Sequence, residues 1–387
     1  MKNCGFLLIP CSESERTNGG VIFRKGKARG RSGASTMIDE QHRIYGKAPG
    51  SYPNREALEP KPSNFPFVLS VLRSGIILIA GVFVTVLSPV IAAEKEAVPT
   101  WTDVKSAKQA RPEFELQGEY KVEVDGTRLG LQVADVDQGQ FHVLFYQGGL
   151  PGDGWNGDAI ETALVHRDDL EAIIEGVKRV VRKSPTLGKK APEGAMVIFD
   201  GEPTEHVKGT IDKGILWAGS STTTPVGDFH MHVEFRLPYK PSRPLSSQDR
   251  GNSGLYIYDN YEIQVLDSFG LDFVTENNAV PTESLNSQWC GSFYKAKTPD
   301  VPMAFPPLVW QTYDIDFTAP KFEGEEKVSN ARATVRHNGV LIHDDYELEG
   351  GTGNGGKRPE KEKGTILFQG HGNPTAFRNV WMIPGGE

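Results

Sequence analysis

Apolar and polar residues alternate through much of the second half of the chain. Between 229 and 237 the odd-numbered positions are apolar and the even-numbered ones polar, and the alternation recurs around Ile263 and Val265 and at 313–317. A period of two is typical of strands that bury one face. Asn338-Gly339 stands between two strand-like runs, which is a strong hairpin signal. About ten short strands in residues 195–387 predict a mainly β fold, a two-sheet sandwich of the jelly-roll type.

The same alternation predicts the core and the register of the strands. A sandwich needs two apolar inner faces, and the expected core residues are Phe229, Met231, Val233, Phe235, Ile263, Val265, Ile315, Phe317 and Phe368. Glu262 and Gln264 then lie on the opposite face from Ile263 and Val265. A slip of one residue would exchange the two faces.

A smaller β-rich module, 113–181, is expected upstream of the sandwich. Strand-like runs at 119–124, 129–136 and 140–146 are followed by a glycine-dense loop at 148–155. Residues 168–181 carry a helical apolar face, with Asp168 and Glu171 as a capping box. Residues 182–194, with two prolines, are predicted to be a linker to the sandwich.

The N-terminal third has a different pattern. Residues 1–64 are polar without apolar periodicity, which predicts a disordered prefix. Residues 65–93 turn apolar, and 74–93 contain no charge. We expect a signal peptide cleaved near Glu94. An uncleaved membrane anchor and a buried core helix are the alternatives. Residues 94–112 are predicted to be a linker, and the protein is expected to be exported, either periplasmic or extracellular, with membrane contact only through 65–93 if that segment is uncleaved.

Composition and charge narrow the function classes. The 43 Gly and 26 Pro of 387 residues favour a turn-rich fold. Residues 1–93 hold 12 Lys and Arg against 6 Asp and Glu, whereas the remainder holds 30 against 44. An acidic body argues against nucleic acid as a partner, because binding phosphates needs clustered cations. Cys290 is the only cysteine after residue 11, so the body has neither a disulfide framework nor a cysteine-based zinc site.

The candidate chemistry lies in polar residues on strands. The sequence has no P-loop, dinucleotide fingerprint, His-Glu-x-x-His or Gly-x-Ser-x-Gly motif. A sheet lined by Glu, Gln, Asn, Arg and His side chains suits a sugar, whose hydroxyls each need a donor and an acceptor, and it can hold a general acid and base. Each such residue has a structural alternative, a solvent-facing strand position or a local turn bond. For Arg378-Asn379 that alternative is pairing with buried carboxylates, and for Asn252-Ser253-Gly254 it is an Asx-turn before a strand.

Several motifs carry a family resemblance. They are Phe199-Asp200-Gly201, Gly227-Asp228-Phe229, Arg250-Gly251-Asn252-Ser253-Gly254-Leu255-Tyr256, Tyr261-Glu262-Ile263-Gln264-Val265-Leu266-Asp267, Ile366-Leu367-Phe368-Gln369-Gly370-His371-Gly372 and Phe377-Arg378-Asn379-Val380-Trp381. In this order and spacing the chain, over about Ala195 to Pro384, resembles the 3-keto-disaccharide hydrolase family, also described as 3-keto-alpha-glucoside-1,2-lyase and 3-keto-2-hydroxy-glucal hydratase. The resemblance implies a concanavalin-like jelly roll. A Trp frequent after Phe-Asp-Gly in such proteins is absent from Glu202–Lys208, so the opening edge of the domain is expected to differ. The upstream module resembles an extra module of exported bacterial proteins, to which no activity is attached.

The resemblance also implies a reaction. Oxidation at C3 of a glucoside acidifies the C2 proton, so a base can remove it and expel the C1 substituent, after which water adds back. Glu262 is the candidate base and His371 the candidate acid or orienting group. Arg236, Asn252, Gln264, Gln369 and Arg378 are the candidate substrate-binding residues, expected around one pocket with Glu262. A divalent cation is an alternative electrophile, with Glu262, Asp267 and His371 as its candidate ligands.

Two functions therefore remain open. One is an exported enzyme that cleaves 3-keto-glycosides, and the other is a non-catalytic glycan-binding module on the same fold. A carboxylic acid poised at the base of a pocket favours the enzyme, whereas aromatic platforms without such a group favour the lectin.

Overall fold

The computed structural model describes residues 98–124, 126–157, 161–271 and 287–385. Lys95–Glu387 forms one compact unit. The predicted prefix and the apolar segment 65–93 lie outside the described residues. None of the helices in the described part of the chain has the length and apolar character needed to cross a bilayer.

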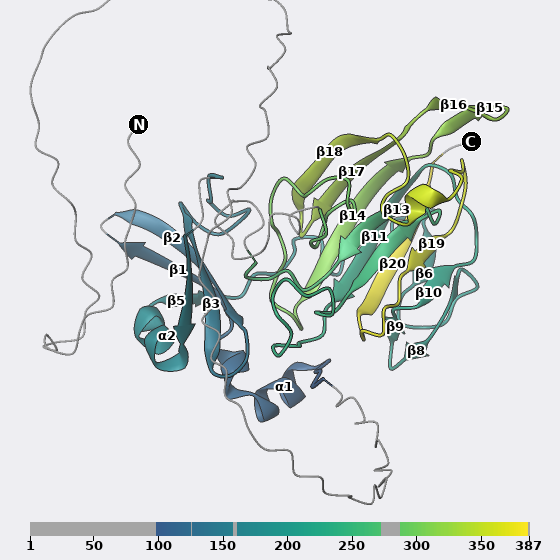
Figure 1. The fold of residues 1–387 in the computed structure, drawn as a ribbon. Helices are drawn as coiled ribbons and strands as arrows, with labels where there is room; N and C mark the ends of the chain where they lie inside the picture. Colours follow the sequence, from purple (N-terminus) through teal and green to yellow (C-terminus); the bar gives the residue numbers. More distant parts are fainter. Residues whose placement is uncertain (1–97, 125, 158–160, 272–286, 386–387) are drawn as a thin grey trace, which may run out of the picture. The chain divides into compact units, whose positions relative to one another are not determined.

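The upstream module is an antiparallel sheet with a helix on one face (Figure 1). Its strand order is β4-β3-β2-β1-β5. Leu170 of the helix is fully buried with Tyr120, Leu131 and Phe141 of the sheet. The elements are α1 (Val104–Ala110), η1 (Pro112–Glu115), β1 (Gly118–Val124), β2 (Thr127–Asp135), β3 (Gln140–Gln147), β4 (Glu161–His166), α2 (Arg167–Ile174) and β5 (Lys178–Val180).

Two local expectations in this region are wrong. Helix α2 ends at Ile174 rather than Val181, because Gly176 takes a positive φ of 71° and the chain then enters β5. His166, not Asp168, is its N-cap residue, and it makes no side-chain capping bond. The predicted linker 94–112 contains helix α1, which Asp103 caps by accepting a hydrogen bond from Ser106 N at 2.9 Å.

Residues 196–384 form the sandwich. Its strands are β6 (Met196–Phe199), β7 (Val207–Lys208), β8 (Ile211–Asp212), β9 (Ile215–Trp217), β10 (Ser220–Thr222), β11 (Phe229–Arg236), β12 (Ser253–Ile257), β13 (Tyr261–Val265), β14 (Trp310–Thr318), β15 (Lys321–Glu323), β16 (Glu326–Ser329), β17 (Ala331–His337), β18 (Val340–Leu348), β19 (Ile366–Phe368) and β20 (Ala376–Pro384), with a 3-10 turn, η3 (Gly355–Lys357).

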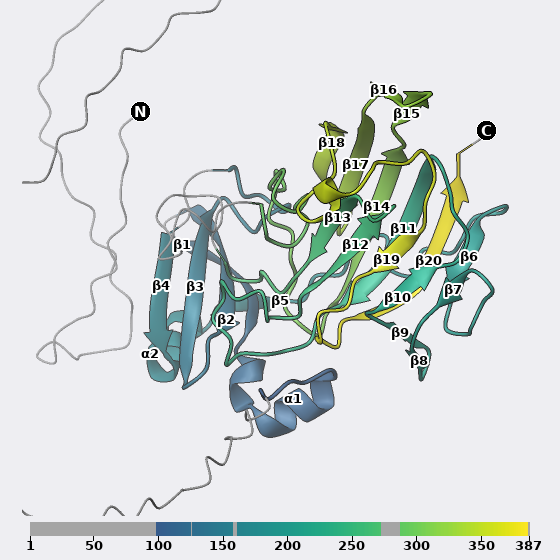
Figure 2. The same ribbon diagram turned by 45° about the vertical axis from the view of Figure 1, so that its right-hand side comes forward.

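These strands make two principal sheets. A five-stranded sheet has the order β13-β12-β19-β10-β7. An eight-stranded sheet has the order β18-β17-β14-β11-β20-β9-β8, with β6 paired to β20. Figure 2 shows β12, β19 and β10 in front of β14, β11 and β20. The predicted mainly β sandwich is confirmed.

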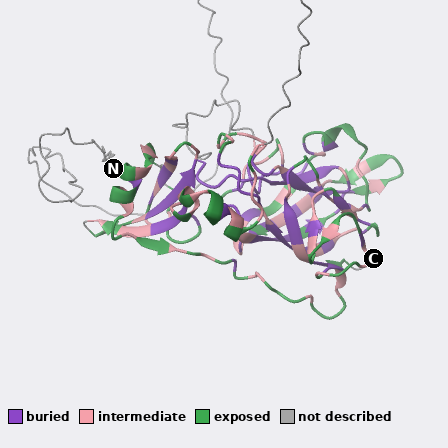
Figure 3. Cartoon of the chain, turned by 90° about the horizontal axis from the view of Figure 1, so that it is seen from below, coloured by how far each residue is buried: buried purple, intermediate pink, exposed green. Residues whose placement is uncertain are grey.

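The core lies between the two sheets, where Figure 3 shows long buried stretches of strand. All nine predicted core residues belong to this cluster. The register is therefore as expected, with Ile263 and Val265 inward and Glu262 and Gln264 outward. The Asn338-Gly339 hairpin also forms between β17 and β18, with φ of 50° and 80°, a conformation that suits these two residues.

Candidate functional site

Glu262 and Gln264 lie on the outer face of the five-stranded sheet, yet both are buried, with exposed fractions of 3% and 1%. Segments from elsewhere in the chain cover them. The Thr352 hydroxyl accepts a hydrogen bond from Glu262 N at 2.7 Å, and the amide of Gln264 donates to Gln248 Oε1 at 3.0 Å. We expected an open face; the covering loops make it an enclosed site.

The Glu262 carboxyl occupies space that Gly254 leaves free. Gly254 is opposite Gln264 in the β12–β13 pairing, one residue pair along from Tyr256 and Glu262. A Cβ atom at position 254 would lie 2.5 Å from Glu262 Oε1 and 3.0 Å from its Cγ. Gly254 lies within β12 rather than in a turn before it. The Asn252-Ser253-Gly254 motif therefore needs glycine for the room that it gives to the carboxyl.

Burial sets the protonation of Glu262. It raises the pKa of the carboxyl to about 7, against the opposing hydrogen bond from the Tyr256 hydroxyl. Tyr256 itself is 6% exposed, and burial together with the Glu262 charge raises its pKa, so it stays a neutral hydroxyl. A carboxyl with a pKa near neutrality can both accept and return a proton, which suits general acid–base chemistry.

Two further acceptors lie beside the Gly254 gap. Gln369 N donates to Gly254 O at 2.8 Å, so Gln369 directly flanks Gly254, while Asn252 precedes it by two residues, the spacing of one strand face. Asn252 Oδ1 and Gln369 Oε1 are buried, and neither has a hydrogen-bond partner among the described residues. Buried oxygens normally have a partner. These two are therefore free to accept hydrogen bonds from the hydroxyls of a ligand.

His371 lies at the same end of the sheet. It is exposed, two residues beyond Gln369, in the loop from β19 to β20. Its position suits a group that acts at the rim of the site rather than in its buried floor.

The candidate metal ligands do not come together. Asp267 is fully buried and pairs with Arg250, whose Nη2 lies 2.9 Å from Asp267 Oδ2. Across the described ranges no three His, Cys, Asp or Glu side chains are grouped as a metal site would require. The predicted ligand set of Glu262, Asp267 and His371 is therefore not assembled, because Asp267 is committed to the core ion pair.

Arg236 and Arg378 lie on the other side of the sandwich, and the expectation that they share a pocket with Glu262 is wrong. Val233, Phe235 and Phe377, their neighbours on β11 and β20, point into the core, so these arginines project from the outer face of the eight-stranded sheet. Both guanidinium groups lie over the Trp310 ring, at 4.8 Å and 4.0 Å from its centroid. The sequence alternation placed each residue on its strand face, but it did not show which sheet each strand joins.

Arg378 belongs to a structural network, the alternative that the sequence left open. Its Nε donates to Glu234 Oε2 at 2.7 Å, and Asn379 Nδ2 donates to Glu234 Oε1 at 2.9 Å. Although burial raises it, hydrogen bonds from His232, Asn379 and the Gly188 amide lower the pKa of Glu234 to about 2. Glu234 is therefore a carboxylate at neutral pH, held by several donors.

The predicted linker 182–194 is docked against this network. Gly188 N donates to Glu234 Oε1 at 2.5 Å, and Trp381 Nε1 donates to Lys189 O at 3.1 Å. Arg182 pairs with Glu119 of the upstream module, at 2.5 Å. The segment thus connects β1 to the outer face of the eight-stranded sheet and is ordered by both.

We expect Arg378→Ala to lower stability without acting on chemistry. Loss of the Glu234 contact should cost about 1–2 kcal/mol of unfolding free energy, since Glu234 keeps other donors and Arg378 is 38% exposed. Turnover per folded molecule should stay within about twofold of wild type. Thermal unfolding and steady-state rates measure both, with the exposed Arg336 on β17 as the control position. A large loss of turnover at unchanged stability would return Arg378 to the catalytic site.

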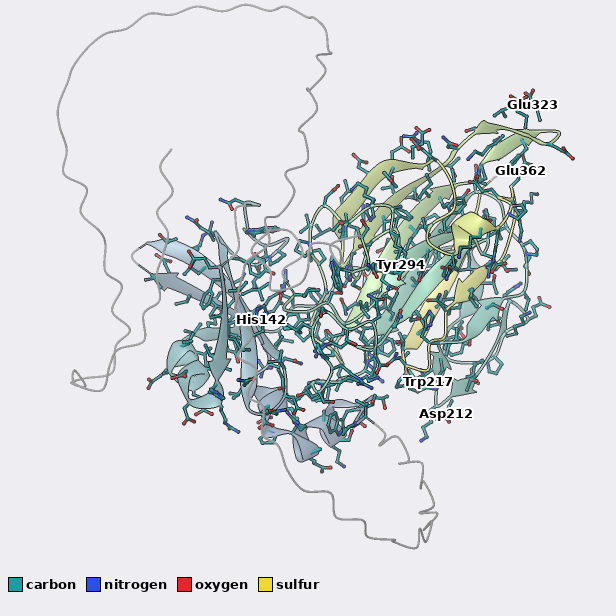
Figure 4. All side chains as sticks on the ribbon, in the orientation of Figure 1. His142, Asp212, Trp217, Tyr294, Glu323 and Glu362 are labelled. Carbon is teal, nitrogen blue, oxygen red and sulfur yellow. The ribbon has the colours of Figure 1, made fainter. Side chains whose placement is uncertain are left out.

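Sequence reasoning missed Tyr256, Tyr294 and Thr352. Tyr256 was visible as the residue two positions after Gly254, on the same strand face. Tyr294 N donates to Glu262 O at 3.0 Å, and Figure 4 labels its side chain in the interior of the sandwich region. Thr352 comes from a Gly/Lys/Glu-rich loop without strand periodicity. Only the fold brings that loop to Glu262, since Thr352 N also donates to Asn260 O at 2.8 Å.

A sequence model of the 3-keto-alpha-glucoside-1,2-lyase-like domain matches residues 153–383. The chain belongs to this family. The match begins upstream of the expected start at Ala195, so it takes in β4, α2, β5 and the docked linker. This extent agrees with the hydrogen bonds that join the linker to β11 and β20.

Solved structures add three similarities, all to proposed glycosyl hydrolases of Parabacteroides distasonis ATCC 8503. The first is 28% identical with a TM-score of 0.42, covering 51% of this chain and 86% of that one. The second is 16% identical with a TM-score of 0.37, covering 50% and 95%. The third is 16% identical with a TM-score of 0.29, covering 49% and 93%. No match was found among the curated proteins.

Proposed function

We propose that this protein cleaves the glycosidic bond of 3-keto-glycosides by elimination followed by hydration. The observation that carries the proposal is the Glu262 carboxyl, which is buried in the Gly254 gap with a pKa of about 7. A base of this pKa is suited to a carbon acid that a neighbouring ketone has activated. Membership of the 3-keto-alpha-glucoside-1,2-lyase-like family supports the same class of substrate.

In the proposed first step, the Glu262 carboxylate takes the C2 proton. The C–H electron pair forms the enolate, whose collapse breaks the C1–O bond and forms the C1=C2 double bond. The leaving oxygen keeps the bonding electron pair and takes a proton from His371 or from water. The products are the released alcohol and a 2-hydroxy-glucal that retains the C3 ketone.

In the proposed second step, water adds across the double bond. The water oxygen bonds to C1, and Glu262 returns its proton to C2, so the net reaction is hydrolysis. Tyr256 holds the Glu262 carboxyl through its hydroxyl. Asn252 and Gln369, whose oxygens are buried and unpaired in the described part of the chain, accept hydrogen bonds from sugar hydroxyls.

The deciding experiment incubates the purified protein with a 3-keto-disaccharide in heavy water. Elimination and hydration should place deuterium at C2 of the released 3-keto-glucose, because the proton held by Glu262 exchanges with solvent. Activity should survive a chelator, since Glu262, Asp267 and His371 do not converge. Hydrolysis without deuterium at C2 would contradict the mechanism. Binding without turnover would favour the glycan-binding alternative.

Replacement of Gly254 by Ala tests the role of the gap. The new methyl would force the Glu262 carboxyl away, since its Cβ would lie 2.5 Å from Oε1. We expect turnover to fall about tenfold or more, the effect of misplacing a catalytic group, with the fold retained because alanine is acceptable in a strand. Gly350→Ala is the matched control, because no atom lies within 4 Å of a Cβ there. Equal activity of the two variants would contradict this role.

We further propose that the enzyme acts outside the cytoplasm. The support is the uncharged run 74–93, which ends in Val90-Ile91-Ala92-Ala93. N-terminal sequencing of the native protein should give a start near Glu94. A membrane-embedded product that retains residues 74–93 would instead show an anchor.

A further inference from the structure

A surface hollow of about 470 Å³ lies at one end of the sandwich, where β9 passes into β10. Figure 4 labels Trp217 there, close to the label of Asp212, and Tyr294 further up in the same view. The hollow does not include Glu262. Its lining comprises Thr100, Trp217, Lys240, Gly372, Asn373 and Pro374, together with Ala218.

One wall of the hollow is polar and firmly held. Lys240 is 5% exposed, and its Nζ donates to Asp249 Oδ1 at 2.9 Å and to Asn373 Oδ1 at 2.8 Å. Asp249 also receives Arg243, at 2.6 Å. The charge of Lys240 is thus balanced within the protein. The wall offers hydrogen-bonding groups without a net attraction for an anion.

The opposite wall is aromatic. Trp217 is half-buried, and its backbone is fixed by hydrogen bonds on either side, from Trp217 N to Thr210 O at 2.9 Å and from Ala218 N to Thr375 O at 3.0 Å. An indole face opposite an amide and an ammonium group matches the two kinds of surface of a sugar ring, its C–H face and its hydroxyl edge.

The hollow adjoins the end of the sheet that carries the Glu262 site. Gly219, next to Ala218, donates to Phe368 O at 2.7 Å, and Gln369 donates to Gly254 O at 2.8 Å. Hence β19 alone separates Gly254 from the segment of the hollow. Two strand spacings are roughly 10 Å, a span comparable with the length of a disaccharide. The loop that carries His371 connects the two places, since Gln369 flanks Gly254 and Gly372 lines the hollow.

We propose that this hollow binds the second sugar ring of the substrate, the ring that leaves when the C1–O bond breaks. The inference rests on the proposed function and specifies its substrate class: a 3-keto-glucosyl disaccharide rather than a 3-keto-glucoside of a small alcohol. His371, at the junction, then lies where the leaving oxygen needs its proton.

The test compares Trp217→Ala with wild type on a 3-keto-disaccharide and on a methyl 3-keto-glucoside. For the disaccharide we expect KM to rise about tenfold, the scale of one lost aromatic contact. The methyl glycoside, which has no second ring, should be turned over with kcat/KM within about twofold of wild type. Trp217→Phe keeps an aromatic face and should restore most of the disaccharide KM.

Two controls keep this outcome separate from the proposed function. Trp310→Ala removes a tryptophan from the other face of the sandwich and should leave both substrates unaffected. If Trp217→Ala does not fold, Trp217→Leu keeps apolar volume without an aromatic ring and is expected to show the same rise in KM. Equal effects of Trp217→Ala on both substrates, or none on either, would overturn the inference.

If wild type turns over neither substrate, the proposed function fails and calorimetric titration with the disaccharide still decides the hollow. Weaker binding by Trp217→Ala than by wild type would support it, and equal or absent binding would overturn it.

Discussion

Glu262→Gln should lower kcat on a 3-keto-glycoside by about a hundredfold or more, the scale of a lost general base. The amide keeps the size of the carboxyl, so it fits the Gly254 gap and leaves the sheet and sugar binding intact. It cannot take the C2 proton. Steady-state kinetics measure the loss, with Glu205→Gln as a matched control, since that side chain is 87% exposed. Full activity of Glu262→Gln would rule out this base.

The pH profile provides a second readout. The base form of Glu262 is needed, and burial raises the pKa of the carboxyl to about 7. The kcat/KM of wild type should therefore fall about tenfold per pH unit below 7 and level off above it. The residual activity of Glu262→Gln should lack this step.

The same shift has a consequence for stability. An unfolded Glu262 titrates near 4.5 and the folded one near 7, so between these values the folded state holds more protons. The contribution of Glu262 to stability is thus fully present below pH 4.5 and declines as pH rises toward 7. Glu262→Gln should be at least as stable as wild type at pH 8, as expected for a group placed for chemistry rather than for folding.

Arg250→Met should cost about 3–5 kcal/mol of unfolding free energy, because it leaves the Asp267 charge buried without its partner. Arg250 and Asp267 are both fully buried, and two guanidinium nitrogens lie 3.1 Å and 2.9 Å from Asp267 Oδ2. Arg250 also donates to Arg243 O at 2.7 Å, which fixes the loop that carries Lys240 and Gln248. Chemical denaturation measures the loss.

Two further variants make this prediction specific. Arg250→Met combined with Asp267→Asn removes the orphaned charge and should be more stable than Arg250→Met alone. Arg332→Met breaks a comparable pair with Asp345 that is exposed, with side-chain exposures of 38% and 68%, and should cost less than about 1 kcal/mol. Similar losses for Arg250→Met and Arg332→Met would contradict a buried structural pair.

The site was only partly foreseeable. The sequence led to Glu262 as the base candidate through the motif that it shares with Gln264 and Asp267. It did not reveal that Asp267 belongs to a core ion pair, because one strand turn changes whether a carboxylate faces a ligand or an arginine. It also grouped Arg378 with Glu262, since residues that lie far apart in the chain carry no label for the sheet that they join.

The sequence by itself determined the mainly β fold, the strand register and the core. Period-two alternation fixes which face of each strand is buried, whatever the partner strand, and the Asn338-Gly339 turn fixes its own hairpin. Only the tertiary structure decided which faces are shared. It placed Glu262 and Arg378 on opposite sides of the sandwich, docked residues 182–194 onto Glu234 as more than a linker, and brought Thr352 over Glu262. The pairing of strands distant in the chain, and the burial that it creates, decided these contacts and gave Glu262 its pKa near 7.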